Sequence, residues 1–190
     1  MEQYLSLENL GVFFSIGFVI LNANGNIISW PLGIIGSAIY TYIFFSVNLY
    51  GDMSLQVFYV LMGVYGWFNW KNSQNKNEEF RVKNIPAIGF LKIILFGAAI
   101  TPIFGFLLEN QTDSDLPYWD SFTTVFSFIA TWMMAKKYLQ NWMIWIVVDG
   151  LCIGIYYYKG LDSTALLFVV YTMMAIYGLI NWRRISMAEA

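Results

Sequence analysis

A single acidic residue, Asp149, lies in the middle of the apolar stretch WMIWIVVDGLCIGIYYY, residues 142–158. On a helix, Trp145, Asp149, Cys152 and Tyr156 follow one another at steps of four, three and four residues, so they share one face. A charge at membrane depth costs roughly 2.5–3.5 kcal/mol on insertion scales, and such a residue is by default a functional candidate. A carboxylate between aromatic rings suits a flat, cationic organic molecule. The alternative is a structural role, in which Asp149 forms a salt bridge or a hydrogen bond that ties helices together. The candidate cations for a salt bridge, all near span ends, are Lys92, Lys136, Lys137 and Lys159.

Further polar and aromatic side chains extend this candidate site. Gln56 and Tyr59 lie in another apolar stretch, although Gln56 could instead form a hydrogen bond to a neighbouring helix. Trp119 and Trp142 lie near span ends, where tryptophan usually belongs to the interfacial belt. The predicted substrate-binding residues are Asp149, Trp145, Tyr156, Gln56, Tyr59, Trp30, Asn141 and Tyr171.

Composition places these residues in a membrane protein. Of the 190 residues, 58% are hydrophobic and only 12% are charged, whereas soluble domains carry about 25% charged residues. The chain has no histidine and one cysteine, which argues against disulfides, common metal sites and histidine-based acid–base catalysis. We therefore expect neither an enzyme nor a cofactor, and no nucleic-acid partner. The N-terminus lacks a basic segment before its apolar run, so no cleavable signal peptide is expected.

Hydropathy predicts an all-α membrane protein with seven transmembrane helices, of which the first is short for a full bilayer crossing and the others are near the required length. Nine of the ten basic residues fall on one side of that topology, and Lys159 alone falls on the other. The positive-inside rule then places the C-terminus in the cytoplasm and the N-terminus outside. The predicted spans cover residues 8–21, 27–47, 52–70, 85–108, 117–135, 141–158 and 161–182.

The chain also repeats itself. YGWFNWK at residues 65–71 reappears as YGLINWR at residues 177–183, an offset of 112, and an upstream offset of 115 pairs Trp30 with Trp145. This predicts a first three-helix repeat at 1–70, a cytoplasmic loop at 71–84, a linker helix at 85–108, a second repeat at 117–182 and a cytoplasmic tail at 183–190. Parallel repeats of this kind indicate a transporter with its site at the repeat interface. With these offsets Asp149 aligns with Ile34 and Gln56 with Phe168, an asymmetry that favours an asymmetric ligand.

The two Tyr-Gly-x-x-Asn-Trp helix ends and the segment NWMIWIVVDGLCIGIYYYKGLDSTALLF resemble the PnuC family of vitamin transporters. The resemblance implies a 3+1+3 helix arrangement similar to a full-length SWEET, in the bacterial inner membrane. It also implies a homotrimer and uptake by facilitated diffusion, with the vitamin trapped by a cytoplasmic vitamin kinase. Family members carry nicotinamide riboside, thiamine or riboflavin. The compact chain favours thiamine, as in the thiamine-transporting members (PnuT). Nicotinamide riboside is the alternative, and a SWEET-like sugar carrier is a more distant one.

Overall fold

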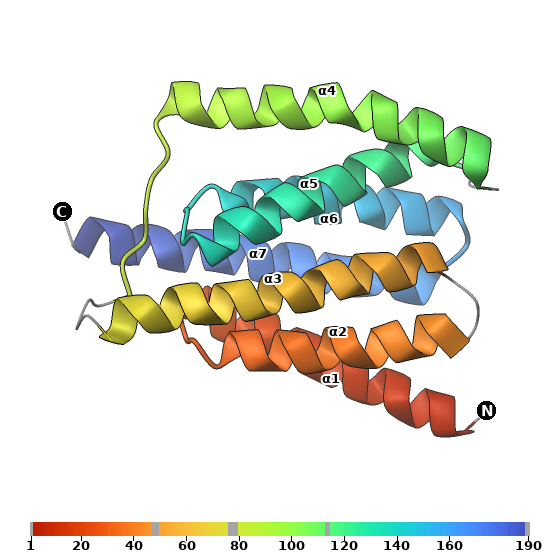
Figure 1. Cartoon of the computed structure of the whole chain (residues 1–190), viewed down its shortest axis with the longest axis horizontal. Helices are drawn as coiled ribbons and strands as arrows, with labels where there is room; N and C mark the ends of the chain where they lie inside the picture. Colours follow the sequence, from red (N-terminus) through yellow and green to blue (C-terminus); the bar gives the residue numbers. More distant parts are fainter. Residues whose placement is uncertain (1, 47–49, 76–79, 113–114, 189–190) are drawn as a thin grey trace. The chain divides into compact units, whose positions relative to one another are not determined.

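The computed structural model describes residues 2–46, 50–75, 80–112 and 115–188, and these form seven α-helices (Figure 1). Each predicted span corresponds to one helix. α3 continues past Trp70 into the segment that was expected to be a loop. The helices are α1 (Glu2–Ala23), α2 (Ser29–Ser46), α3 (Tyr50–Asn75), α4 (Ala87–Gln111), α5 (Pro117–Ala135), α6 (Asn141–Tyr158) and α7 (Asp162–Ala188).

The helices belong to two compact units. Unit 1 comprises Met1–Arg81 with Arg184–Ala190, and unit 2 comprises Val82–Arg183. In unit 1, α2 packs against both α1 and α3. In unit 2, α5 packs against both α4 and α6, while aromatic rings join α6 to α7. The expected linker helix, α4, therefore packs within the same unit as the second set of three helices.

Local sequence explains several helix ends. The missing N–H of proline costs little in the first turn of a helix, which is where Pro31 and Pro117 lie. Gly25 and Gly160 adopt positive φ angles of 69° and 70° in the turns after α1 and α6, a conformation that glycine adopts without steric cost. Lys137, after α5, adopts the same left-handed conformation with φ 62°.

The turns after α1 and α5 have the same backbone structure at a single offset. α1 and α5 end at residues 23 and 135, and α2 and α6 cover residues 29–46 and 141–158, so each pair of bounds differs by 112. Gly25 and Lys137, the two left-handed residues, are also 112 apart. The matching backbone hydrogen bonds, donor first, are Gly25 to Asn22 and Lys137 to Met134, Asn26 to Leu21 and Tyr138 to Met133, and Ser29 to Asn26 and Asn141 to Tyr138.

The upstream offset of 115 predicted from residue identity is therefore wrong. The structure pairs Trp30 with Trp142 rather than with Trp145, and Asp149 corresponds to Ser37 rather than to Ile34. The pairing of Gln56 with Phe168, which already used an offset of 112, is unchanged.

Each unit contains one buried tryptophan pair at equivalent positions. Trp30 meets Trp70 edge to face, with ring centroids 5.5 Å apart and planes at 87°, and Trp142 meets Trp182 at 5.5 Å and 89°. All four rings are 0–1% exposed. The expectation that Trp142 belongs to an interfacial belt is consequently wrong, because the ring lies inside unit 2. Trp119 is half exposed, as a belt residue would be.

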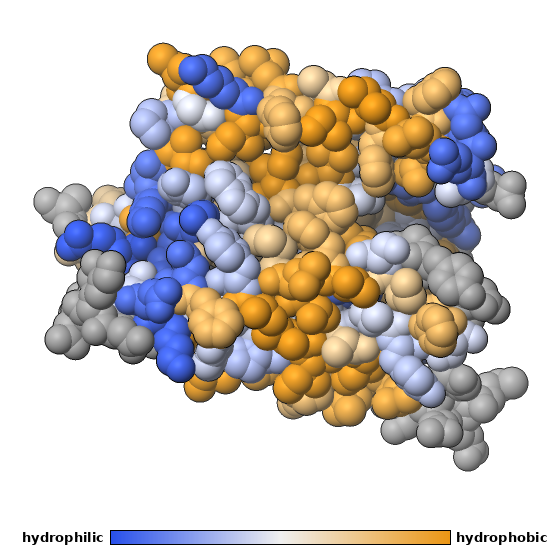
Figure 2. Space-filling model, in the orientation of Figure 1, coloured by the Kyte–Doolittle hydropathy of each residue, from blue (hydrophilic) through white to orange (hydrophobic). Residues whose placement is uncertain are grey.

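Exposed apolar side chains fit a membrane environment. α4 alone exposes Ile88, Phe96 and Ile103 by more than 60% each, and Figure 2 shows hydrophobic side chains over the middle of the helices and hydrophilic ones nearer their ends. By length and composition, two described helical segments could cross a membrane, Ala87–Gln111 and Thr164–Ala188, and Leu7–Ala23 is a shorter apolar helix.

Candidate functional site

Asp149 is buried in the middle of α6. Its side chain is 5% exposed, and no described residue forms a hydrogen bond or an ion pair with it. An ion pair on this unit joins the Lys159 Nζ to an Asp120 carboxylate oxygen, 3.8 Å apart, near the end of α6. A buried charge costs several kcal/mol unless a partner offsets it. Asp149 therefore has no partner among the described side chains. None of the four lysines considered as structural partners forms an ion pair with it.

Aromatic side chains flank Asp149 along the same helix. Trp145 and Tyr156 are half-buried and pack against a core cluster that includes Val148 and Cys152. Trp145 precedes Asp149 by one turn, so their Cβ atoms are about 5–6 Å apart. The indole N–H of Trp145 is buried and has no acceptor among the described residues. One face of α6 thus carries an unpaired acceptor and an unpaired donor one turn apart.

A chain of rings continues from α6 to α7. Tyr156 stacks on Phe168 with centroids 5.1 Å apart and planes at 21°, and Phe168 meets Tyr171 edge to face at 5.7 Å. Offset and edge-to-face pairs contribute about 0.5–1.5 kcal/mol beyond their buried area. Asp149 and Tyr156 thus lie on the same helix, and ring contacts through Phe168 join Tyr156 to Tyr171 on α7. Phe168, which joins the two tyrosines, was not in the predicted set.

Two predicted site residues have clear structural contacts instead. Asn141 is fully buried at the start of α6, and its side-chain amide donates to the Tyr138 carbonyl at 2.7 Å. Trp30 is 1% exposed, and its ring contacts Phe18 at 5.8 Å as well as Trp70. These contacts hold both residues in place, while the Asn141 Oδ1 and the Trp30 indole N–H, like the Trp145 indole N–H, are buried with no partner among the described residues.

Gln56 and Tyr59 lie on α3 in unit 1, and both are partly buried. Tyr59 contacts Phe58 edge to face, with centroids 5.9 Å apart. Gln56 and Tyr59 therefore belong to a different unit from the candidates on α6 and α7.

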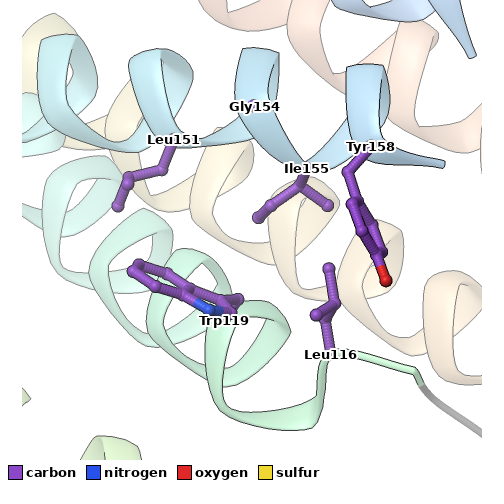
Figure 3. Close-up of a pocket in the computed structure, with 6 residues that line it drawn as sticks. All are labelled: Leu116, Trp119, Leu151, Gly154, Ile155 and Tyr158. Atoms are coloured by element: carbon purple, nitrogen blue, oxygen red, sulfur yellow. The ribbon is translucent and has the colours of Figure 1, made fainter. Parts of the chain in front are cut away.

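A hollow of about 270 Å³ lies between the start of α5 and the end of α6. Figure 3 shows Trp119 and Leu116 facing Leu151, Ile155 and Tyr158 across it. The hollow is lined mostly by apolar surface and contains none of the predicted site residues. Sequence reasoning missed it, because it depends on which faces of α5 and α6 meet. Within the described part of the chain, no three Asp, Glu, His or Cys side chains gather into a possible metal site.

Comparison with known proteins identifies the family. The model of the nicotinamide mononucleotide transporter family matches residues 5–184, almost the whole chain. Nicotinamide riboside transporter PnuC of Escherichia coli is 27% identical over 93% of this chain and 84% of its own length. Riboflavin/roseoflavin transporter RibM of Streptomyces davaonensis is 20% identical over 81% of this chain and 73% of its own length.

A solved structure agrees with this assignment. The crystal structure of the vitamin B3 transporter PnuC superposes with a TM-score of 0.79 and 26% identity, over 97% of this chain and 83% of that one. The resemblance to PnuC proteins noted from the helix-end motifs is thereby confirmed, as is the all-helical fold. The chain belongs to the nicotinamide mononucleotide transporter family, which includes the PnuC proteins, and is a multi-pass membrane transporter of vitamins rather than an enzyme.

Proposed function

We propose that this protein carries nicotinamide riboside across the membrane. The observation that carries the proposal is the buried carboxylate of Asp149, which has no partner among the described side chains and shares a face of α6 with Trp145 and Tyr156. Nicotinamide riboside joins a positively charged aromatic ring to a ribose with hydroxyl groups. The ring would approach the carboxylate and the aromatic faces, and a polar atom of the substrate would accept from the Trp145 indole.

Thiamine shares the positive aromatic ring but finds less support. Four curated relatives reported at 26–27% identity are named nicotinamide riboside transporters, and a fifth is named for riboflavin. Our expectation of thiamine rested on chain length alone. Riboflavin is neutral and leaves Asp149 without a charged partner. A SWEET-like sugar carrier would also need no carboxylate at this position.

In this proposal the substrate contacts are Asp149, Trp145, Tyr156 and Tyr171 from unit 2, with Gln56 and Tyr59 as the contribution of unit 1. Trp30 and Asn141 remain in the predicted set, and in this proposal they support the site through their packing and hydrogen-bond contacts. The equivalent turns at the offset of 112 support a 3+1+3 arrangement of seven spans as parallel repeats. The charge distribution supports a cytoplasmic C-terminus and an outer N-terminus in the inner membrane.

The proposal includes passive transport. Asp149 is the one mid-span acid in the spans predicted from the sequence, so a relay of titratable groups that would couple transport to protons is not evident. The resemblance to the PnuC family implies facilitated diffusion with trapping by a cytoplasmic vitamin kinase, and assembly as a homotrimer.

Transport by the purified protein in liposomes tests this function. Liposomes preloaded with unlabelled nicotinamide riboside should accumulate the labelled compound transiently by exchange, without a kinase, an ion gradient or ATP. Preloading with thiamine or riboflavin should give less exchange. Exchange driven by thiamine but not by nicotinamide riboside would replace the proposed substrate, and strict dependence on a proton gradient would refute the passive mechanism.

A further inference from the structure

The segment that precedes α4 is bound to the turn between α5 and α6. The Lys83 N–H donates to the Lys137 carbonyl at 2.8 Å, and the Leu139 N–H donates to the Lys83 carbonyl at 2.9 Å. These bonds form an isolated parallel bridge between Lys83 and Tyr138. Val82 beside them is 6% exposed. Backbone pairing of this kind fixes the segment regardless of the exposed Lys83 side chain.

Gln140 extends the pairing by one more residue. Its side-chain oxygen accepts from the Ile85 N–H at 3.2 Å, and its side-chain nitrogen donates to the Ile85 carbonyl at 3.0 Å. The amide thus imitates the backbone of a neighbouring strand and satisfies both polar groups of Ile85. Pro86 follows and α4 begins at Ala87. Four hydrogen bonds in this region therefore attach the start of α4 to the α5–α6 turn.

The same segment is also anchored in unit 1, by a different contact. The Phe80 ring lies against Gly25 so closely that a Cβ on that glycine would be 2.6 Å from a ring atom. Phe80 also packs against Trp70, with centroids 4.7 Å apart, and Trp70 is 1% exposed. Phe80 thus covers the left-handed residue of the α1–α2 turn.

The two anchors contact equivalent positions of the two units. Gly25 and Lys137 are the left-handed residues of turns with the same backbone hydrogen bonds. Phe80 contacts the first and Lys83 pairs with the second, and only Arg81 and Val82 lie between Phe80 and Lys83. Three residues of extended chain reach about 10 Å at most, so the connection limits how far the two anchors can move apart.

We propose that residues 80–86 form a strap that couples the α1–α2 turn to the α5–α6 turn during transport. A displacement that draws one turn away from the other would be transmitted through Phe80 and Lys83, because a connection this short limits their separation. The strap acts on the rate of conformational exchange and contacts no substrate. The inference rests on the proposed function only in needing a substrate to measure that rate.

Two insertions of the same composition test the strap. Gly-Gly between Arg81 and Val82 lengthens the connection between the anchors, whereas Gly-Gly between Asn77 and Glu78 lies before both anchors and serves as the control. The first should lower the maximal exchange rate of nicotinamide riboside roughly two- to thirtyfold, the effect expected when a residue that couples two sites is altered. Its Kd should stay unchanged, and the control should match the wild type. Equal rates for the two insertions would overturn the proposal.

Point variants of Gln140 give an independent readout. Gln140→Ala removes both bonds to Ile85 and should lower the maximal rate, while Gln140→Glu retains an acceptor for the Ile85 N–H and should fall between Ala and the wild type. Gln111→Ala, at the exposed end of α4, is the matched control. Hydrogen exchange at Lys83 and Leu139 reports whether the anchor persists. A folded Gln140→Ala protein with wild-type rate and weakened amide protection would refute the coupling.

An inactive wild type would instead count against the proposed substrate. The strap is then measured without substrate, by the hydrogen exchange of the α1–α2 turn. Gly-Gly between Arg81 and Val82 should change that exchange, and the control insertion should not. Unchanged exchange in both would overturn the strap.

Discussion

The tryptophan pair of unit 2 gives a prediction with a magnitude that follows from its packing. Gly178 lies against the face of Trp142, and a Cβ there would be 2.7 Å from ring atoms, where ordinary contact begins at 3.4 Å. Trp142 is 1% exposed and meets Trp182 edge to face, so the ring has no free space to enter. Overpacking of this kind costs about 1–3 kcal/mol, from which the helical preference for alanine recovers up to about 1 kcal/mol. Gly178→Ala should therefore lower the free energy of unfolding by up to about 2 kcal/mol.

Gly154→Ala is the matched control on α6. Nothing lies within 4 Å of a Cβ at Gly154, so the substitution should stabilise the protein by about 0.5–1 kcal/mol. Thermal unfolding of both variants in detergent, followed by tryptophan fluorescence, measures the difference. Gly66→Ala, whose Cβ would be 2.5 Å from Trp30, should resemble Gly178→Ala if the units are equivalent. A Gly178→Ala protein as stable as Gly154→Ala would refute the packing argument.

Three smaller substitutions probe other contacts by the same assay. Ser121→Ala removes the hydroxyl that donates to the Thr101 carbonyl at 2.6 Å in a fully buried position, and should cost about 1–3 kcal/mol. Gly25→Ala should destabilise by a similar amount, since alanine in a left-handed turn costs about 1–2 kcal/mol and its Cβ would also meet Phe80. Asp120→Asn breaks a partly exposed ion pair with Lys159 and should change stability by less than about 1 kcal/mol. A larger loss for Asp120→Asn than for Ser121→Ala would contradict these assignments.

Sequence alone predicted the helices well, because apolar runs and turn residues mark them directly. The bounds predicted for the fifth and sixth spans, 117–135 and 141–158, are those of α5 and α6. The turn sequence after residue 21 placed the first break close to the end of α1 at Ala23. The extension of α3 to Asn75 was missed, since polar residues near a membrane surface can continue a helix.

Apolar runs and turn residues could not predict which side chains face the interior of a unit. Helices that are apolar on every side show no amphipathic face, so no sequence pattern placed Trp142 inside unit 2 rather than at the membrane surface. Residue identity also aligned Trp30 with Trp145, and only the backbone hydrogen bonds of the turns corrected that register. The burial of Asp149 was anticipated, because one acid in a long apolar run has few other places to lie.

Calorimetric binding of nicotinamide riboside to the purified protein tests the central claim most directly. The comparison is with Asp149→Asn, which keeps the size of the side chain but removes its charge, and with Asp120→Asn as a control at a partly exposed acid. A hydrogen bond to a charged group contributes about 1.5–3 kcal/mol, so Asp149→Asn should weaken binding roughly ten- to hundredfold. Asp120→Asn should bind as the wild type does. Binding that is unchanged in Asp149→Asn, or absent in the wild type while thiamine binds, would contradict the account.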